Sequence, residues 1–199
     1  MSKPTTHIIV CCADRKKGGT PEHHRLRHVQ NAQTLDERAR LWMDALSRSL
    51  LPPTPARAVY AGDHWTQVLE LAALLPQAQI WVLSAGYGLI PIDHPIVPYS
   101  ATFAPGVPDE VTLDKSQRRM QRRRWWSLLC ANSDYTLEAM GQKHSKDCFV
   151  MVAAPNYLDA IHDDVLAMNQ VVADDHLTII CAGTNPIKKL DHLCLPVSA

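Results

Sequence analysis

Short apolar runs alternate along the chain with longer segments in which apolar residues recur every three or four positions. A short apolar run is typical of a strand buried on both faces of a parallel sheet, and the longer recurrence is typical of an amphipathic helix. The runs that predict buried strands are residues 7–13, 80–83, 148–154 and 177–182, with a weaker candidate at 57–61.

The clearest helix signal is the capping box at residues 34–37, Thr-Leu-Asp-Glu, which puts a hydroxyl at the N-cap and a carboxylate three positions later. Apolar residues then recur on one face as far as Leu50, and prolines from Pro52 onward end the helix. Similar patterns predict helices over residues 63–75, 114–130, 136–143 and 158–168.

The order of strand 57–61, helix 63–75 and strand 80–83 has the spacing of a βαβ unit, which predicts a parallel pair of strands. A chain of 199 residues suits one core. We therefore expect a single α/β domain over residues 1–199, with a mostly parallel central sheet flanked by helices. Residues 91–111 contain five prolines and predict a long irregular loop, a kind of segment that is usually functional.

Composition narrows the class of protein. Apolar residues make up 46% of the chain, as in globular proteins, and no stretch reaches the roughly 18 apolar residues that a membrane span needs. With no signal-peptide pattern at the N-terminus, we expect a soluble, cytoplasmic protein without a membrane partner. The six cysteines form no CxxC pair and predict buried thiols, so neither a metal nor a cofactor is required.

Several catalytic motifs are missing from the sequence. It has no GxGxxG after the first strand, no Walker loop, no GxSxG and no HExxH. Their absence argues against dehydrogenases, NTPases, serine hydrolases and zinc peptidases.

Charge is balanced overall, with a formal net charge of zero, but one segment is strongly basic. Residues 115–124 precede Trp125 and Trp126, and basic side chains beside aromatic rings can grip phosphates and stack on bases. The alternative is a solvated helix face with a buried tryptophan. The candidate nucleic-acid contacts in this segment are Arg118, Arg119, Arg122, Arg123 and Arg124.

Polar residues follow several of the predicted strands. Because the carboxyl ends of parallel strands lie at one edge of a sheet, we expect these residues to converge on one site. The candidates are Asp14, Arg15, Lys16 and Lys17 after the first strand, Ser84, Gly86, Tyr87 and Gly88 after the central one, and then Asn156, Tyr157 and Asn185.

The composition of this edge suits a nucleobase or nucleotide. Tyr87 and Tyr99 offer rings for stacking, and Asn156 and Asn185 offer paired donors and acceptors for a base edge. Arg15 and its neighbouring lysines could hold phosphate. The alternatives are packing roles for the tyrosines and helix-capping roles for the asparagines.

Asp93 is the candidate catalytic carboxylate, with Asn156 beside it. It lies between Pro91 and Pro95, where a carboxylate can be fixed and partly desolvated. Such a group can stabilise an oxocarbenium-like cation or activate water when an N-glycosidic bond is cleaved. An exposed aspartate in an Asx turn is the competing interpretation.

At this point the residues suggest a family. Residues 84–90, Ser-Ala-Gly-Tyr-Gly-Leu-Ile, followed by Asp93, Ile96, Pro98 and Tyr99, resemble a signature of YaaA-like proteins and of a related bacterial family. The segments 8–16, 60–65 and 153–157 resemble three further motifs of the family in the same order. This chain departs from the pattern at Gly86, where relatives commonly have lysine, and at Ser100, where they often have aspartate.

The resemblance implies a DNA-associated protein whose fold is YaaA-like or like that of uracil-DNA glycosylase. Defence-type DNA glycosylases are plausible relatives. The leading hypothesis is therefore a DNA glycosylase that flips a damaged or modified base into a pocket beside Tyr87 and Tyr99. Two alternatives stay open, namely a noncatalytic DNA-binding protein of stress or defence, and an N-glycosidase acting on free nucleosides or nucleotides.

Overall fold

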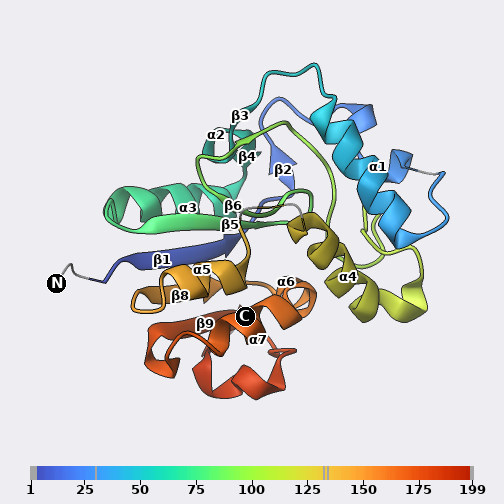
Figure 1. The fold of residues 1–199 in the computed structure, drawn as a ribbon. Coiled ribbons are helices and arrows are strands. Elements are labelled where there is room, and N and C mark those ends of the chain that lie inside the picture. Colours follow the sequence, from blue (N-terminus) through green and yellow to red (C-terminus); the bar gives the residue numbers. More distant parts are fainter. Residues whose placement is uncertain (1–3, 30, 132, 134, 198–199) are drawn as a thin grey trace.

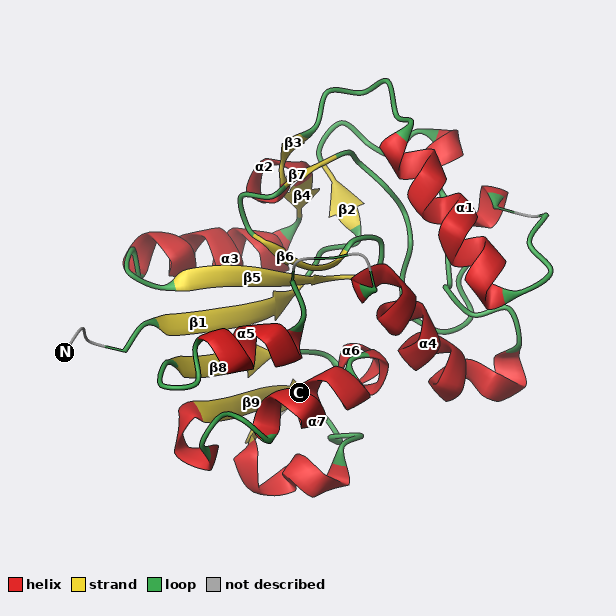
Figure 2. Cartoon of the chain, in the orientation of Figure 1, coloured by secondary structure: helices red, strands yellow, loops and turns green. Residues whose placement is uncertain are grey.

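The computed structural model describes residues 4–29, 31–131, 133 and 135–197 and contains a central six-stranded sheet (Figure 2). Its strands occur in the spatial order β10-β9-β8-β1-β5-β6, and all neighbours are parallel except β5 and β6. The strands are β1 (Thr6–Cys11), β5 (Gln79–Ser84), β6 (Gly88–Pro91), β8 (Cys148–Val152), β9 (Leu177–Ala182) and β10 (Cys194–Val197).

Helices and short ribbons complete the fold. The helices are α1 (Leu35–Ser47), α2 (Ala56–Val59), α3 (Asp63–Leu74), α4 (Arg118–Cys130), α5 (Leu137–Lys143), α6 (Pro155–Ala160) and α7 (His162–Asn169). Two small antiparallel ribbons pair β2 (Arg15–Lys16) with β4 (Tyr60–Ala61) and β3 (Thr54–Pro55) with β7 (Pro95–Ile96). Short 3-10 turns occupy Glu22–His24, Leu26–His28, Lys115–Gln117, Asp174–His176 and Lys188–Leu193.

The predicted α/β class and mostly parallel sheet are confirmed. The start of α1 is also as predicted, because the Thr34 hydroxyl accepts a hydrogen bond of 3.2 Å from the Glu37 amide. Three predictions about helices need adjustment. The helix expected over 114–130 begins at Arg118, after a 3-10 turn over Lys115–Gln117. The helix expected to reach Leu50 ends at Ser47, and the helix expected over 158–168 is two helices, α6 and α7.

The βαβ unit is not the one that the spacing predicted. Residues 57–61 contribute no strand to the main sheet, because Ala56 and Val59 bury one side of the single-turn helix α2 and the chain then enters β4. The parallel pair is β1 with β5, and α3 lies between them in sequence.

Two strands of the sheet were not predicted. The chain does not leave the sheet after Ser84, but turns through Gly88, whose φ of 77° suits glycine, and returns as β6. Beyond β9, residues 194–197 add β10 at the edge of the sheet, so β9 is not the last strand.

The topology places a crevice between β1 and β8. From β1 the chain continues to β5 and β6 on one side, and it then returns to β8 on the other side of β1 before adding β9 and β10. Neighbouring strands that lead away in opposite directions form the switch point at which open α/β sheets bind ligands. In Figure 1, α1 and α4 lie side by side beyond the carboxyl ends of these strands. Among the described residues, none of the helices has the length and apolar character to cross a membrane.

Candidate functional site

A cavity of about 570 Å³ lies at the switch point. That volume is within the roughly 300–1,000 Å³ typical of small-molecule sites. The ends of β1, β8 and β9 line it with apolar residues that include Ala13, Val152 and Ile180. Four of the predicted site residues reach it, namely Asp14, Arg15, Asn156 and Tyr157.

These four residues come from two segments that the parallel register brings together. Asp14 and Arg15 follow β1 and are exposed, whereas Asn156 is half-buried and Tyr157 is buried in the first turn of α6. The predicted convergence at one sheet edge is therefore right for the ends of β1 and β8.

The beginning of α3 forms another wall of the cavity. The sequence predicted that a helix begins there but not that it lines a site. Gly62 is the N-cap with φ of 105°, and the first backbone bond of the helix runs from the Thr66 amide to the Gly62 carbonyl. The amides before Thr66 have no partner within the helix, and such amides attract anions. Asp63 and His64 line the cavity from the same turn, and His64 Nε2 lies 3.1 Å from the Cys11 carbonyl.

Cys12 lies at the cavity and is joined to a buried chain of hydroxyl groups. Its Sγ is 3.1 Å from the Tyr157 hydroxyl and 3.5 Å from the Tyr99 hydroxyl. The Tyr99 hydroxyl is in turn 2.7 Å from Ser84 Oγ and 2.9 Å from the Tyr60 hydroxyl. The sequence predicted only a buried thiol at Cys12, because nothing in the local pattern shows which hydroxyls surround it.

Residues 84–99 pack around these hydrogen-bonded hydroxyl groups and do not line the switch-point cavity. Tyr99 is completely buried, so the expectation that its ring stacks on a ligand is wrong. Ser84 Oγ accepts the Gly86 and Tyr87 amides at 3.2 and 3.0 Å, which fixes the turn after β5. The Gly86 carbonyl accepts from the Trp42 indole at 2.9 Å and so ties α1 to the same turn.

Tyr87 and Gly86 line a different cavity, of about 460 Å³, between α1, α4 and residues 94–97. The Tyr87 hydroxyl accepts from the Val97 amide at 3.1 Å and donates to the Val97 carbonyl at 3.4 Å. Tyr87 therefore does not share a pocket with Asn156, contrary to the prediction. Gly88 is buried in the hairpin.

Asp93 is also outside the main cavity. Its side chain is 63% exposed and forms an ion pair with Arg57, with Arg57 Nη2 2.7 Å from Asp93 Oδ2. The prediction that Asp93 and Asn156 lie in one pocket is wrong, because the hairpin of β5 and β6 carries Asp93 away from the switch point. Asp14 and Asp63 are the carboxylates at the cavity.

Asn185 is likewise internal rather than available to a base. It is 7% exposed, its amide nitrogen donates to the Ile187 carbonyl at 2.9 Å, and its oxygen accepts the Ile187 amide at the same distance. Both the NH2 group and the oxygen of its side-chain amide are thus hydrogen-bonded within its own loop.

Of the two lysines that follow β1, Lys16 is engaged within the protein and Lys17 is not. Lys16 Nζ donates to the Ala13 and Asp14 carbonyls at 2.9 and 3.1 Å and stands 4.4 Å from the centre of the Tyr99 ring. Burial lowers the pKa of Lys16. Its ammonium closes the loop after β1, whereas Lys17 is exposed.

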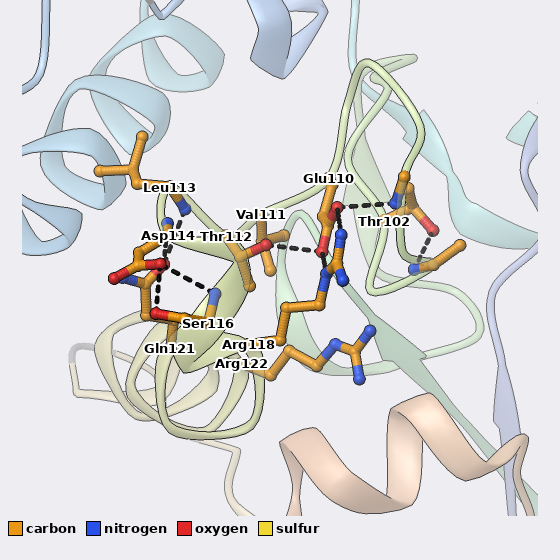
Figure 3. A network of polar contacts seen from close by, with 12 residues as sticks. Thr102, Glu110, Val111, Thr112, Leu113, Asp114, Ser116, Arg118, Gln121 and Arg122 are labelled. Atoms are coloured by element: carbon orange, nitrogen blue, oxygen red, sulfur yellow. Dashed lines mark hydrogen bonds and ion pairs between the residues drawn. The ribbon is translucent and has the colours of Figure 1, made fainter.

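The arginines of the basic helix α4 pair with carboxylates of the protein. Arg118 turns toward Glu110, and Nε donates to Oε1 at 2.7 Å (Figure 3). Arg124 pairs with Asp36 at the start of α1. These two arginines therefore join α4 to its neighbours.

Three further arginines converge on Asp159 of α6. The Asp159 side chain is 7% exposed and lies 3.1, 3.6 and 3.6 Å from Arg119, Arg122 and Arg123 respectively. Arg122 is itself 8% exposed, whereas Arg119 is 70% exposed. Trp126 is buried, and the contact of this helix with nucleic acid stays a prediction.

One group of described side chains has the spacing of a metal site. The ligand atoms of His7, His144 and Asp147 lie within 4.8 Å of one another at the amino ends of β1 and β8. However, the Trp81 indole donates to His7 Nδ1 at 3.2 Å, which leaves the proton of neutral His7 on Nε2, facing Asp147 at 3.1 Å. Metal ligation through Nε2 would need that proton on Nδ1, against the Trp81 N–H, so this arrangement fits a hydrogen-bonded cluster better than a metal centre.

Comparison of the chain with protein-family models, with curated proteins and with solved structures finds no match.

Proposed function

We propose that this protein is a DNA glycosylase that cleaves the N-glycosidic bond of a damaged or modified base held in the switch-point cavity. The observation that carries the proposal is the meeting, in one cavity of about 570 Å³, of apolar residues with Asp14, Arg15 and Asn156. A planar apolar ring with polar edges fits such a lining. The resemblance of residues 84–99 to DNA-associated proteins supports the same class of substrate.

Asn156 and the apolar lining would hold the base. The amide of Asn156 offers both a donor and an acceptor, which suits a base edge, and no side-chain hydrogen bond within the described protein occupies it. Extruding a base from a duplex costs a few kcal/mol, least for a damaged or mismatched base, and contacts in the cavity offset that cost.

Asp14 takes the role that the sequence analysis gave to Asp93. An ionised carboxylate beside the sugar would stabilise the oxocarbenium-like transition state or accept a proton from the attacking water. Water adds to C1′ of the sugar, the C1′–N bond breaks, and the base leaves with the proton. Arg15 and the amino end of α3 lie at the same cavity and would bind the flanking phosphate.

A second candidate, hydrolysis of free nucleotides, is favoured by one observation. Arg118, Arg122 and Arg124 of the basic helix are engaged with carboxylates of the protein, which reduces the positive charge available to a DNA backbone. A free nucleotide would need only Arg15 and the amino end of α3 for its phosphate.

The test is a base-release assay on duplexes that each carry one damaged or modified base, with free nucleotides run in parallel. Asp14→Asn should lower the rate by about 100-fold or more while binding persists. The substitution keeps the contact with Lys16, which uses the Asp14 carbonyl. Asp93→Asn is the matched control and should retain activity, since Asp93 pairs with Arg57 elsewhere.

The outcomes separate the assignments. Loss of activity in Asp93→Asn, with Asp14→Asn active, would return the catalytic role to Asp93. Release from free nucleotides but not from DNA would favour the second candidate. The absence of release from every duplex and every nucleotide would overturn both.

A further inference from the structure

Cys12 differs from its neighbour Cys11 in its surroundings. Both line the switch-point cavity, but burial raises the pKa of Cys11, which therefore stays a thiol. Cys12 instead has two phenol hydroxyls near its sulfur, those of Tyr157 at 3.1 Å and Tyr99 at 3.5 Å. The proposed glycosidic cleavage uses neither the sulfur nor these hydroxyls.

Counting protons along the buried chain fixes the direction of its hydrogen bonds. Ser84 Oγ accepts two backbone amides, so both its lone pairs are used and its own proton must go to the Tyr99 oxygen at 2.7 Å. The Tyr60 hydroxyl has Tyr99 at 2.9 Å and, at 3.5 Å, the already saturated Ser84 oxygen. Because the Tyr99 oxygen is the nearer of the two, we assign the Tyr60 proton to it in place of the longer bond from Tyr60 to Ser84 Oγ.

With two protons directed at its oxygen, Tyr99 can donate only to Cys12 Sγ. Among the side chains that the structure describes, the Tyr157 hydroxyl has the same sulfur as its hydrogen-bond partner. If Cys12 is a thiol, its proton can point to Tyr157. If Cys12 is a thiolate, Tyr157 rotates its proton toward the sulfur, which then accepts two O–H groups.

The three tyrosine hydroxyls of this network stay protonated and can therefore act as hydrogen-bond donors. Burial raises the pKa of Tyr60, Tyr99 and Tyr157 above their usual range, so each phenol keeps its proton. The ammonium of Lys16 adds a positive charge 4.4 Å from the centre of the Tyr99 ring. Hydrogen bonds to an ionised sulfur and a nearby cation are the features that activate cysteine nucleophiles.

We propose that Cys12 is a nucleophilic thiol that forms a covalent bond with the electrophilic carbon of a small ligand held in the switch-point cavity. The inference uses the cavity but does not require glycosidic cleavage. The ligand class is a compact molecule that carries an alkylating or conjugate-acceptor carbon. The resulting adduct would occupy the space beside Asn156 and block the cavity.

Iodoacetamide is the probe, applied in limiting amount to the native full chain. The sulfur of Cys12 attacks the CH₂ carbon, the carbon–iodine bond breaks, iodide leaves with the bonding electrons and the thiol proton passes to solvent. Fragment-resolved peptide mass spectrometry then ranks the six cysteines and separates Cys11 from Cys12. Cys12 should be labelled first, ahead of the half-buried Cys148 and Cys194.

Tyr157→Phe removes one hydroxyl and keeps the ring that packs edge-on against Phe103. It should slow labelling of Cys12 by about tenfold, the loss expected for a hydrogen bond to a charged group, and move the pH profile of labelling upward. Tyr135→Phe is the control, because Tyr135 lines the other cavity and should change neither.

Labelling of Cys12 no faster than Cys148 in the wild-type protein, or an unchanged rate and pH profile in folded Tyr157→Phe, would overturn the proposal. The wild-type ranking needs no variant, so poor folding of Tyr157→Phe cannot rescue it. Rapid labelling of Cys12 together with no base release would leave this inference standing and remove only the glycosylase. Base release without preferential labelling would do the reverse.

Discussion

The ring of Tyr99 fills the space that a side chain at Gly86 would need. A Cβ at residue 86 would lie 2.4 Å from Cε2 of Tyr99, well inside any van der Waals contact. Gly86 is not among the glycines with positive φ, so space rather than backbone conformation demands glycine here. Glycine at residue 86, where the YaaA-like proteins that residues 84–90 resemble commonly have lysine, thus has a packing reason in this chain.

Gly86→Ala should destabilise the protein by about 1–3 kcal/mol, the usual cost of forcing extra volume into a packed core. Urea unfolding at neutral pH measures this change. Because the clash is with one ring, the cost should fall in a Tyr99→Leu background, and a double-mutant cycle gives the coupling. Equal costs of Gly86→Ala in both backgrounds would show that Tyr99 is not the obstacle.

Replacing Asp109 or Asp93 with asparagine should lower the free energy of unfolding by different amounts, although both aspartates pair with an arginine. Asp109 is 4% exposed and accepts from the Arg27 amide and side chain and from Ser100, whereas Asp93 is an exposed partner of Arg57. Asp109→Asn should cost about 1–3 kcal/mol, because a buried carboxylate that accepts several hydrogen bonds is lost, although its partner Arg27 is itself 37% exposed. Asp93→Asn should cost about 0–1 kcal/mol. Similar losses in the two unfolding curves would contradict this difference in burial.

Stability should fall as the pH drops below neutrality, in part because of His7. Its side chain is fully buried, and that burial lowers its pKa despite the hydrogen bond to Asp147. The unfolded chain therefore binds a proton near pH 6.5 before the folded chain does. The contribution of His7 is complete above about pH 6.5 and is lost as the pH falls from there toward its lower folded pKa.

Unfolding free energies measured at pH 7.5 and 5.5 check the sign. His7→Gln cannot titrate in this range and should show a smaller decrease than the wild type. Some decrease should remain, because burial also lowers the pKa of His24 and His94. A steeper decrease in His7→Gln than in the wild type would reverse the assignment.

Short-range sequence patterns, namely apolar runs and a helix-capping residue, predicted much of the fold. Four of the six sheet strands follow apolar runs, and the Thr34 cap sets the start of α1 as its residue pattern predicted. Residues 57–61 were misassigned because a single turn of helix and a two-residue strand leave no periodic pattern to read. Residues 194–197 form a strand only because β9 lies beside them.

The candidate site was predictable only where the parallel topology decided it. Asp14, Arg15, Asn156 and Tyr157 meet because they follow neighbouring parallel strands. Asp93 and Tyr87 were misplaced because their position depends on the antiparallel return through β6. The chain of hydroxyls at Cys12 joins residues up to 145 positions apart, which no local pattern can show.

The arginines of α4 should separate into structural and binding residues. Arg122 and Asp159 are both more than nine-tenths buried, so Arg122→Ala should leave a buried carboxylate with fewer partners and lower the unfolding free energy by about 3–5 kcal/mol. Arg119 contacts the same carboxylate from a 70% exposed position, and Arg119→Ala should change stability by less than about 1 kcal/mol. If the helix also contacts DNA phosphates, Arg119→Ala should weaken DNA binding. The slope of the logarithm of the DNA-binding constant against the logarithm of the salt concentration should then become smaller in magnitude by about 1, the value for one lost phosphate contact. An unchanged salt dependence would limit these arginines to holding α4 against α6.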